Sequence, residues 1–143
     1  MGAEIIMPEY EVIALDEAQA QYVDNRLEDY DKKCITYTIE GAVSLGVLKD
    51  SKLIGGVNAC MTAYHILYVS TLFVEQAYRH KGVGRALMNR LESEAKKLGA
   101  NMIRLDSFDW QGALFYEKIG YKKVGEYRNE KDSFSEYFFL KEI

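Results

Sequence analysis

The residues most suggestive of chemistry lie in one short segment, RHKGVGRAL, residues 79–87. It combines four basic side chains with two glycines: Arg79, His80, Lys81, Gly82, Gly84 and Arg85. Glycine has no Cβ, so its backbone can approach a ligand closely. A helix that begins near Gly82 would also present unpaired N–H groups and a partial positive charge, which favour anions. The segment therefore predicts a site for a strongly anionic group.

Three phosphate-binding patterns can be compared with this segment. A Walker A loop requires Gly-x-x-x-x-Gly-Lys-Ser/Thr, which Gly82 and Gly84 do not supply. A dinucleotide fingerprint requires a third glycine, where this chain has Leu87. The third pattern is Arg/Gln-x-x-Gly-x-Gly/Ala after a strand that ends in Leu-x-Val, and LFVEQAYRHKGVGRAL contains all of it. A lone Gly-x-Gly would leave an ordinary helix start as the alternative.

Two segments together resemble the GNAT N-acetyltransferase superfamily. One is the glycine-containing segment, and the other, ALFYEKIGYKKVGEY (residues 113–127), is similar to the later helix and strand of that family. Their order and separation fit the resemblance. The chain departs from the family pattern at Gln76, where proline is common, and at Asp109, where an asparagine usually contacts the cofactor. Gln111 is an alternative for that contact.

The resemblance implies acetyl-CoA as cosubstrate and no metal. The pyrophosphate would lie on N–H groups of residues 80–85, with added charge from Arg79 and Lys81, and the strand before them would contact the pantetheine arm and stabilise the oxyanion. The implied cofactor-binding set is Leu72, Phe73, Val74, Arg79, His80, Lys81, Gly82, Val83, Gly84, Arg85 and Ala86.

The resemblance also implies Tyr116 as the catalytic residue that protonates the departing CoA thiolate. A phenol with a pKa of about 10 can donate this proton. The alternative is a packed helix aromatic, because the chain has 11 tyrosines. The general base stays open, with Asp106, His65 and Glu75 as candidates, or a water relay ordered by Tyr68 and Ser70.

Aromatic residues near the expected acceptor site have two interpretations. Phe108 and Trp110 are candidates to line the acceptor cleft, although packing is the commoner role for such side chains. The resemblance implies that the region of Tyr22, Tyr30 and Tyr37 covers the acceptor site. That region varies in the family, so the acceptor's identity does not follow from the resemblance.

The hydrophobic pattern predicts an α/β (α+β) fold with the order β-αα-βββ-α-β-α-ββ and a mixed central sheet of about seven strands. Strands are expected at residues 9–15, 43–48, 53–63, 66–74, 102–106, 121–127 and 134–140, and helices at 16–33, 82–98 and 110–119. Residues 66–74 form an apolar run, which predicts a central strand buried on both faces. Asp16 is an expected N-cap, and Gly99 and Gly120 are expected helix stops. Val83, Leu87, Leu91, Ala95 and Leu98 form the apolar face of the second helical region.

Composition limits the function classes. The 143 residues predict one domain, residues 1–143. A net charge of −4 argues against nucleic acid as a partner. The chain has no apolar run long enough for a membrane span, and its N-terminus lacks the basic region of a signal peptide, so we expect a cytoplasmic protein. Cys34 and Cys60 are expected to be buried free thiols.

The resemblance implies an enzyme that transfers an acetyl group from acetyl-CoA to a primary amine by direct attack in a ternary complex. A small amine is the favoured acceptor. The alternatives are a protein amino-group acetyltransferase and a sensor module that binds acyl-CoA without turnover. The apolar segment 136–140 allows a homodimer but is equally compatible with a place in the core.

Overall fold

The computed structural model describes residues 9–37 and 39–143. The chain divides into two compact units between Thr38 and Ile39. The first contains helix α1 (Glu17–Asp31), whose N-terminus has the expected cap: Asp16 Oδ1 accepts a hydrogen bond from the Gln19 N–H at 2.8 Å. The Gln19 side chain accepts one in return from the Asp16 N–H at 3.1 Å, which completes a capping box.

The strand expected at residues 9–15 is absent from the structure. Tyr10 forms an isolated bridge, and residues 11–15 have no regular structure. Side-chain alternation describes one face of a strand, but a strand also requires a hydrogen-bonded neighbour along its length. The N-terminal residues that bear on a signal peptide lie largely outside the described residues, which omit residues 1–8.

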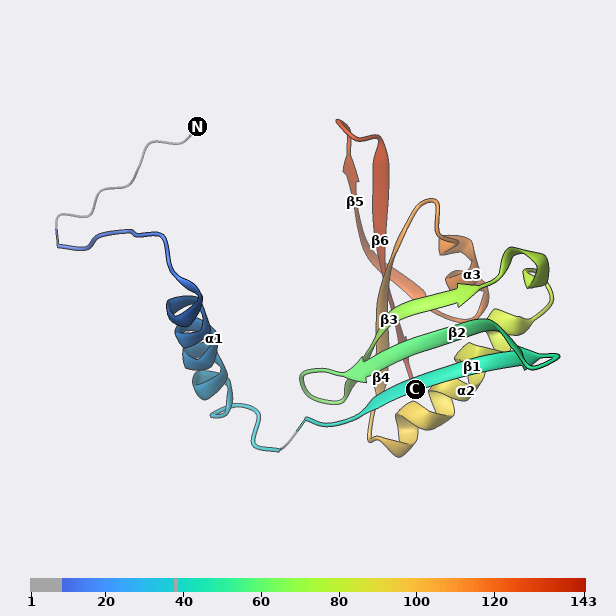
Figure 1. Ribbon diagram of the computed structural model, residues 1–143, viewed down its shortest axis with the longest axis horizontal. Coiled ribbons are helices and arrows are strands. Elements are labelled where there is room, and N and C mark those ends of the chain that lie inside the picture. The colour runs from blue at the N-terminus through green and yellow to red at the C-terminus, as the bar shows by residue number, and fades with distance from the viewer. Residues whose placement is uncertain (1–8, 38) are drawn as a thin grey trace. The chain divides into compact units, whose positions relative to one another are not determined.

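The second unit is built on one six-stranded mixed sheet with the order β1-β2-β3-β4-β6-β5 (Figure 1). Its strands are β1 (Ala42–Lys49), β2 (Lys52–Met61), β3 (Ile66–Val74), β4 (Met102–Phe108), β5 (Lys122–Asn129) and β6 (Phe134–Glu142). Strands β3 and β4 are parallel, and all the other neighbours are antiparallel. The mixed α/β architecture is thus confirmed, with six strands in place of about seven.

Helices α2 (Val83–Lys97) and α3 (Ala113–Lys118) contribute to the same hydrophobic core. The expected face of α2 is confirmed for Leu87, Leu91 and Ala95, which are buried. Leu98 is 37% exposed, and Met88 is buried in addition. Each large side chain buried in this way stabilises the fold by roughly 1.5–3 kcal/mol. Gly99 and Gly120 follow the helices with φ of 91° and 98°, as expected of helix stops.

Two expectations about burial are wrong. Strand β3 is third of six in the sheet, but only Leu67 and Val69 are fully buried, whereas Phe73 is half exposed. The two helices of this unit pack on one face of the sheet, so an apolar run does not guarantee cover on the other. Cys34 and Cys60 are both free and exposed.

No helix among the described residues is long and apolar enough to cross a membrane. The segment that allows a homodimer or a place in the core, residues 136–140, contains both core and surface positions. Phe139 is 1% exposed and belongs to the core, whereas Phe138 is 36% exposed. This alternation is the ordinary pattern of a strand with one covered face.

Candidate functional site

The site is centred on a divergence of the two parallel strands. Strands β3 and β4 pair only from Ile66 to Tyr68 and from Met102 to Arg104. Beyond that point β3 stays with β2, and β4 stays with β6, so the two strands diverge, as Figure 1 shows. Beyond this point the backbone N–H and C=O groups of β3 and β4 that face each other do not form hydrogen bonds between the two strands. An extended ligand can use such groups as another strand would.

The end of β3 leads into the glycine loop, which we define as residues 79–86. His80 has a φ of 61° and Gly82 a φ of 86°, so two left-handed residues precede helix α2. Such turns direct successive N–H groups into one concave anion-binding surface. No side chain caps α2, and no acidic residue lies in its first turn. The first N–H groups of α2 therefore remain for a ligand.

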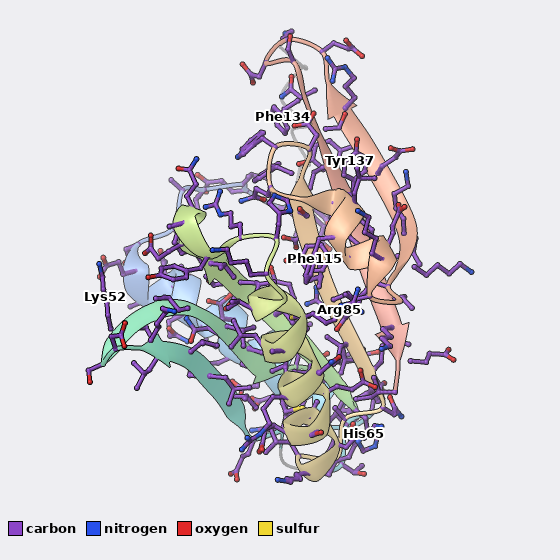
Figure 2. The ribbon with its side chains drawn as sticks, turned by 90° about the vertical axis from the view of Figure 1, so that its right-hand side faces the viewer. Lys52, His65, Arg85, Phe115, Phe134 and Tyr137 are labelled. Atoms are coloured by element: carbon purple, nitrogen blue, oxygen red, sulfur yellow. The ribbon has the colours of Figure 1, made fainter. Side chains whose placement is uncertain are left out.

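The two glycines of this loop are required for different reasons. A Cβ at Gly82 would meet no atom within 4 Å, but the positive φ would strain any other residue. A Cβ at Gly84 would lie 3.2 Å from the Phe115 ring of α3. Figure 2 labels Phe115 and Arg85 where α2 and α3 approach each other. Gly84 thus permits close helix packing, and Gly82 permits the turn.

The basic side chains of the loop do not act alike in the structure. Arg79 turns back to β3, where its Nε donates to the Val74 carbonyl at 2.8 Å. Its guanidinium lies 5.4 Å from the centre of the Phe73 ring. Arg79 therefore joins the loop to the strand. Lys81 and Arg85 are exposed and lie on either side of the α2 N-terminus.

Tyr116 lies on α3 with 8% of its surface exposed. Its ring contacts Phe115, Tyr121 and Phe139, with centroid distances of 5.3, 6.0 and 5.6 Å. Burial, and secondarily the charge of Asp106, raises the pKa of Tyr116 to about 12. No described residue hydrogen-bonds its hydroxyl, and no fully enclosed polar side-chain atom lacks a partner in the described part of the chain. The hydroxyl therefore keeps access to solvent and remains a neutral proton donor at physiological pH.

Asp106 and Tyr68 come together across the divergence of β3 and β4. The Tyr68 hydroxyl donates to Asp106 Oδ2 at 3.1 Å. Partial burial, followed by the charge of Asp106, raises the pKa of Tyr68. Arg104 lies on the other side of this pair, with its guanidinium carbon 4.4 Å from the centre of the Tyr68 ring. A carboxylate thus lies on β4 just beyond the last paired residues.

The other base candidates lie elsewhere. His65 precedes β3, about 10 Å of strand before the divergence begins. Glu75 follows the far end of β3 and is exposed. Ser70 donates its hydroxyl to the Asn58 carbonyl at 3.2 Å, on the β2 side. Of the candidates, Asp106 is the one whose charge acts on Tyr116, and its hydrogen bond with Tyr68 lies at the divergence.

Neither replacement for the usual asparagine has a side chain wholly available to a cofactor. Asp109 accepts from the Ser135 N–H at 3.0 Å and returns a backbone bond of 3.0 Å, which extends the β4–β6 pairing. Gln111 Oε1 accepts from the Phe108 N–H at 2.8 Å. Its amide nitrogen remains a possible donor.

The aromatic residues after β4 form part of a larger group. The Phe108 and Trp110 rings stack at 4.6 Å, and Phe134 contacts both edge-on. Trp110 is 66% exposed, so this group is a surface and not a core. The contributions of Tyr127, Phe134, Glu136 and Phe138 were not predicted from the sequence. Alternation along the final hairpin could have placed them on one face.

A separate shallow hollow of about 290 Å³ lies between β1 and α2. Its charged residues satisfy one another, because Arg90 and Lys97 both pair with Glu94, at 2.9 and 3.2 Å. Its lining contains none of the catalytic or cofactor-binding candidates. The divergence of β3 and β4 is therefore the better candidate, since it combines open backbone groups, a proton donor and a carboxylate.

Comparison with known proteins places this architecture among acetyltransferases. Residues 40–123 match the model of the acetyltransferase (GNAT) domain. Acetyltransferase Atu2258 of Agrobacterium fabrum is 31% identical over 100 residues, which are 70% of this chain and 67% of that protein.

Solved structures agree with this match. A crystal structure of an acetyltransferase from Bacillus cereus has a TM-score of 0.84 and 29% identity, over 96% of this chain and 100% of that chain. An aminoglycoside 6'-N-acetyltransferase complexed with coenzyme A has a TM-score of 0.65 at 18% identity, over 92% and 97% of the two chains. The second similarity concerns the fold alone.

Proposed function

Because this chain belongs to the GNAT family of acetyltransferases, we propose that it transfers the acetyl group of acetyl-CoA to the primary amine of a small molecule by direct attack in a ternary complex. The divergence of β3 and β4, with Tyr116 and Asp106 beside it, is the observation that carries this proposal. The match to a fold relative that binds coenzyme A supports the choice of cosubstrate.

The cosubstrate would bind mainly to backbone groups. Its pyrophosphate would accept hydrogen bonds from N–H groups of residues 80–85, with Lys81 and Arg85 adding positive charge and Arg79 holding the loop to β3. The pantetheine arm would pair with the β3 edge of Leu72–Val74 in the divergence. The same edge would donate to the carbonyl oxygen as negative charge develops on it.

The acceptor must lose a proton before it attacks. A lysine-like amine has a pKa of about 10.4, so deprotonation at pH 7 costs roughly 4–5 kcal/mol. Asp106 would hold the ammonium group and accept its proton, directly or through water ordered with Tyr68. The free amine then attacks the thioester carbonyl carbon and forms the C–N bond.

The tetrahedral intermediate collapses by breaking the C–S bond. The sulfur leaves with the electron pair, and the Tyr116 hydroxyl donates a proton to it, giving CoA as the thiol. The Tyr116 hydroxyl, with a pKa of about 12, keeps its proton until the thiolate forms. The nitrogen became positively charged when the C–N bond formed, and it releases its excess proton to solvent to give the neutral amide. Tyr116 regains a proton from solvent, since its hydroxyl is not enclosed.

Thermal unfolding with acetyl-CoA, free CoA and NADH tests the cosubstrate. A ligand at 100 times its Kd adds about 2.7 kcal/mol of stability, so both CoA species should raise the Tm while NADH should not. Thiol release in the presence of an amine panel then tests turnover. A Tm shift without thiol release from any amine would favour a sensor, and no shift at millimolar acetyl-CoA would overturn the proposal.

A further inference from the structure

Beyond Asp106, the outer face of the sheet carries an unusual group of aromatic side chains. We define the outer face as the side opposite α2 and α3. Five residues of this face or its rim form what we call the aromatic platform: Phe108, Trp110, Tyr127, Phe134 and Phe138. Tyr127 lies 6.2 Å from Phe134 and 6.0 Å from Phe138, centroid to centroid. The platform is therefore continuous across β4, β6 and β5.

Glu136 lies within this platform. It pairs with Phe108 on one side and with Tyr127 on the other, so all three side chains share the outer face. Its carboxylate accepts a 2.5 Å hydrogen bond from the Tyr127 hydroxyl. Glu136 is half-buried and forms no ion pair with any described residue. A partly desolvated carboxylate among aromatic rings favours a cation as its partner.

Asp106 and Glu136 are diagonal neighbours on this face. Asp106 pairs with Phe138, and Glu136 lies two residues before Phe138 on β6. Diagonal neighbours in an antiparallel pair are roughly 7–8 Å apart. Arg104, the cation of the same row of β4, pairs with Leu140 and lies on the far side of Asp106 from Glu136. The face thus presents two carboxylates at a spacing that a short aliphatic chain can span.

We propose that the acceptor carries a second cationic group, which Glu136 and the aromatic platform bind while Asp106 holds the reacting amine. The favoured substrates are then short aliphatic diamines. This inference rests on the proposed function, since it names the substrate class of the same site. Ring faces attract a cation within about 6 Å, and the methylene chain gains apolar contact with the same rings.

A matched pair of amines tests this inference. Putrescine has an ammonium group at each end, whereas pentylamine has nearly the same length with a methyl group at the far end. Trp110 is the chain's one tryptophan, so its fluorescence reports on the platform independently of turnover. We expect putrescine to bind about tenfold more tightly than pentylamine, from one exposed cation–π contact and one carboxylate contact.

Two substitutions on the same hairpin separate the site from general charge effects. Glu136→Gln should reduce the preference for putrescine to about threefold, the part that the cation–π contact alone contributes. Glu126→Gln removes the same charge from the residue before Tyr127. The side chain of Glu126 points to the other face of the sheet, so this variant should retain the preference. Tyr127→Phe keeps the ring and loses the hydrogen bond, so it should reduce the preference only in part. Circular dichroism verifies that each variant is folded.

The outcomes distinguish this inference from the proposed function. Equal affinity for the two amines in the unaltered protein overturns the inference, as does an unchanged preference in Glu136→Gln. A Trp110 signal that responds to protein concentration and not to putrescine would assign the platform to a contact between copies, and would also overturn it. Tight putrescine binding without thiol release from acetyl-CoA would leave the diamine site standing and reject the transfer reaction.

Discussion

The glycine loop and the aromatic platform are opposite solutions to binding a charged ligand. The loop would hold an anion with backbone N–H groups, and its shape depends on two left-handed residues, His80 and Gly82. The platform would hold a cation with side chains, through Glu136 and a group of rings. One region would recognise its ligand by main-chain conformation, and the other by the types of its side chains.

This difference bears on what each region can specify. A backbone site tolerates many side-chain changes so long as its φ angles are kept, which suits a cosubstrate that does not vary. A side-chain site changes its ligand with a single substitution, which suits an acceptor that does. On the proposed function, the fold would therefore separate a constant cosubstrate site from an adjustable acceptor site.

The largest effect on activity is expected at Tyr116, which belongs to neither the glycine loop nor the aromatic platform. Tyr116→Phe should lower kcat by at least about a hundredfold, because the thiolate loses its proton donor. The Kd for acetyl-CoA, measured by the shift in Tm, should change by less than about twofold. A variant that loses acetyl-CoA binding as well would show that Tyr116 belongs to the cosubstrate site.

Asp106 tests the acceptor side of the comparison. Asp106→Asn should reduce kcat/KM for the amine by about tenfold, because the ammonium group loses its counter-charge and its proton acceptor. The reduction should shrink as pH rises towards the pKa of the amine, about 10, where the free amine is present in solution. A loss that is the same at pH 7 and pH 10 would reject Asp106 as the acceptor of that proton.

The two glycines test the loop. Gly82→Ala forces a side chain into φ of 86° and should cost about 1 kcal/mol of stability, with a loss of about fivefold in acetyl-CoA affinity. Gly84→Ala meets the Phe115 ring at 3.2 Å but gains helix propensity, so its stability should change by less than about 0.5 kcal/mol. His80→Gly, which relieves a left-handed residue, serves as the control and should keep the affinity. A larger affinity loss in Gly84→Ala than in Gly82→Ala would mean that the ligand, and not Phe115, requires that glycine.

The smallest effect concerns pH. The pKa of Tyr116 is raised to about 12, so the folded state favours its protonated form. The resulting stability is complete below about pH 10 and is lost as the pH rises from 10 towards 12. Burial also raises the pKa of Tyr121, so absorbance titration of tyrosinate should show more than one late-titrating tyrosine, and Tyr116→Phe should lack one of them. If Tyr116→Phe instead lacks a phase near pH 10, the Tyr116 hydroxyl is well solvated.

Local patterns predicted most of the sheet and both helices of residues 39–143. Strand β3 begins and ends where its apolar run does, and the helix stop at Gly99 follows from the need for a left-handed residue. The exposed outer side of β3 was missed, because an apolar run does not state how many layers cover it. The exposure of Cys60 was missed for the same reason, since it depends on which face of β2 receives α2.

Local sequence patterns predicted individual residues of the site but not the contacts between residues far apart in the chain. The residues of the glycine loop are consecutive, so a motif can find them. The hydrogen bond of Tyr68 with Asp106 joins residues 38 positions apart, and the Tyr127–Glu136 bond depends on hairpin register. Even within the loop, the need for Gly84 follows from Phe115, a contact across two helices that spacing does not express.

The place of β6 in the sheet has a consequence for how the molecule is made. It is synthesised after β5 but lies between β5 and β4, and it contributes the fully buried Phe139. While the chain emerges from the ribosome, β5 has no sheet to join until β6 follows it. A nascent chain stalled before Phe134 would leave the edge of β4 without a neighbouring strand and the core without Phe139. Folding of this half of the sheet must therefore await the synthesis of β6, because β5 reaches β4 only through it.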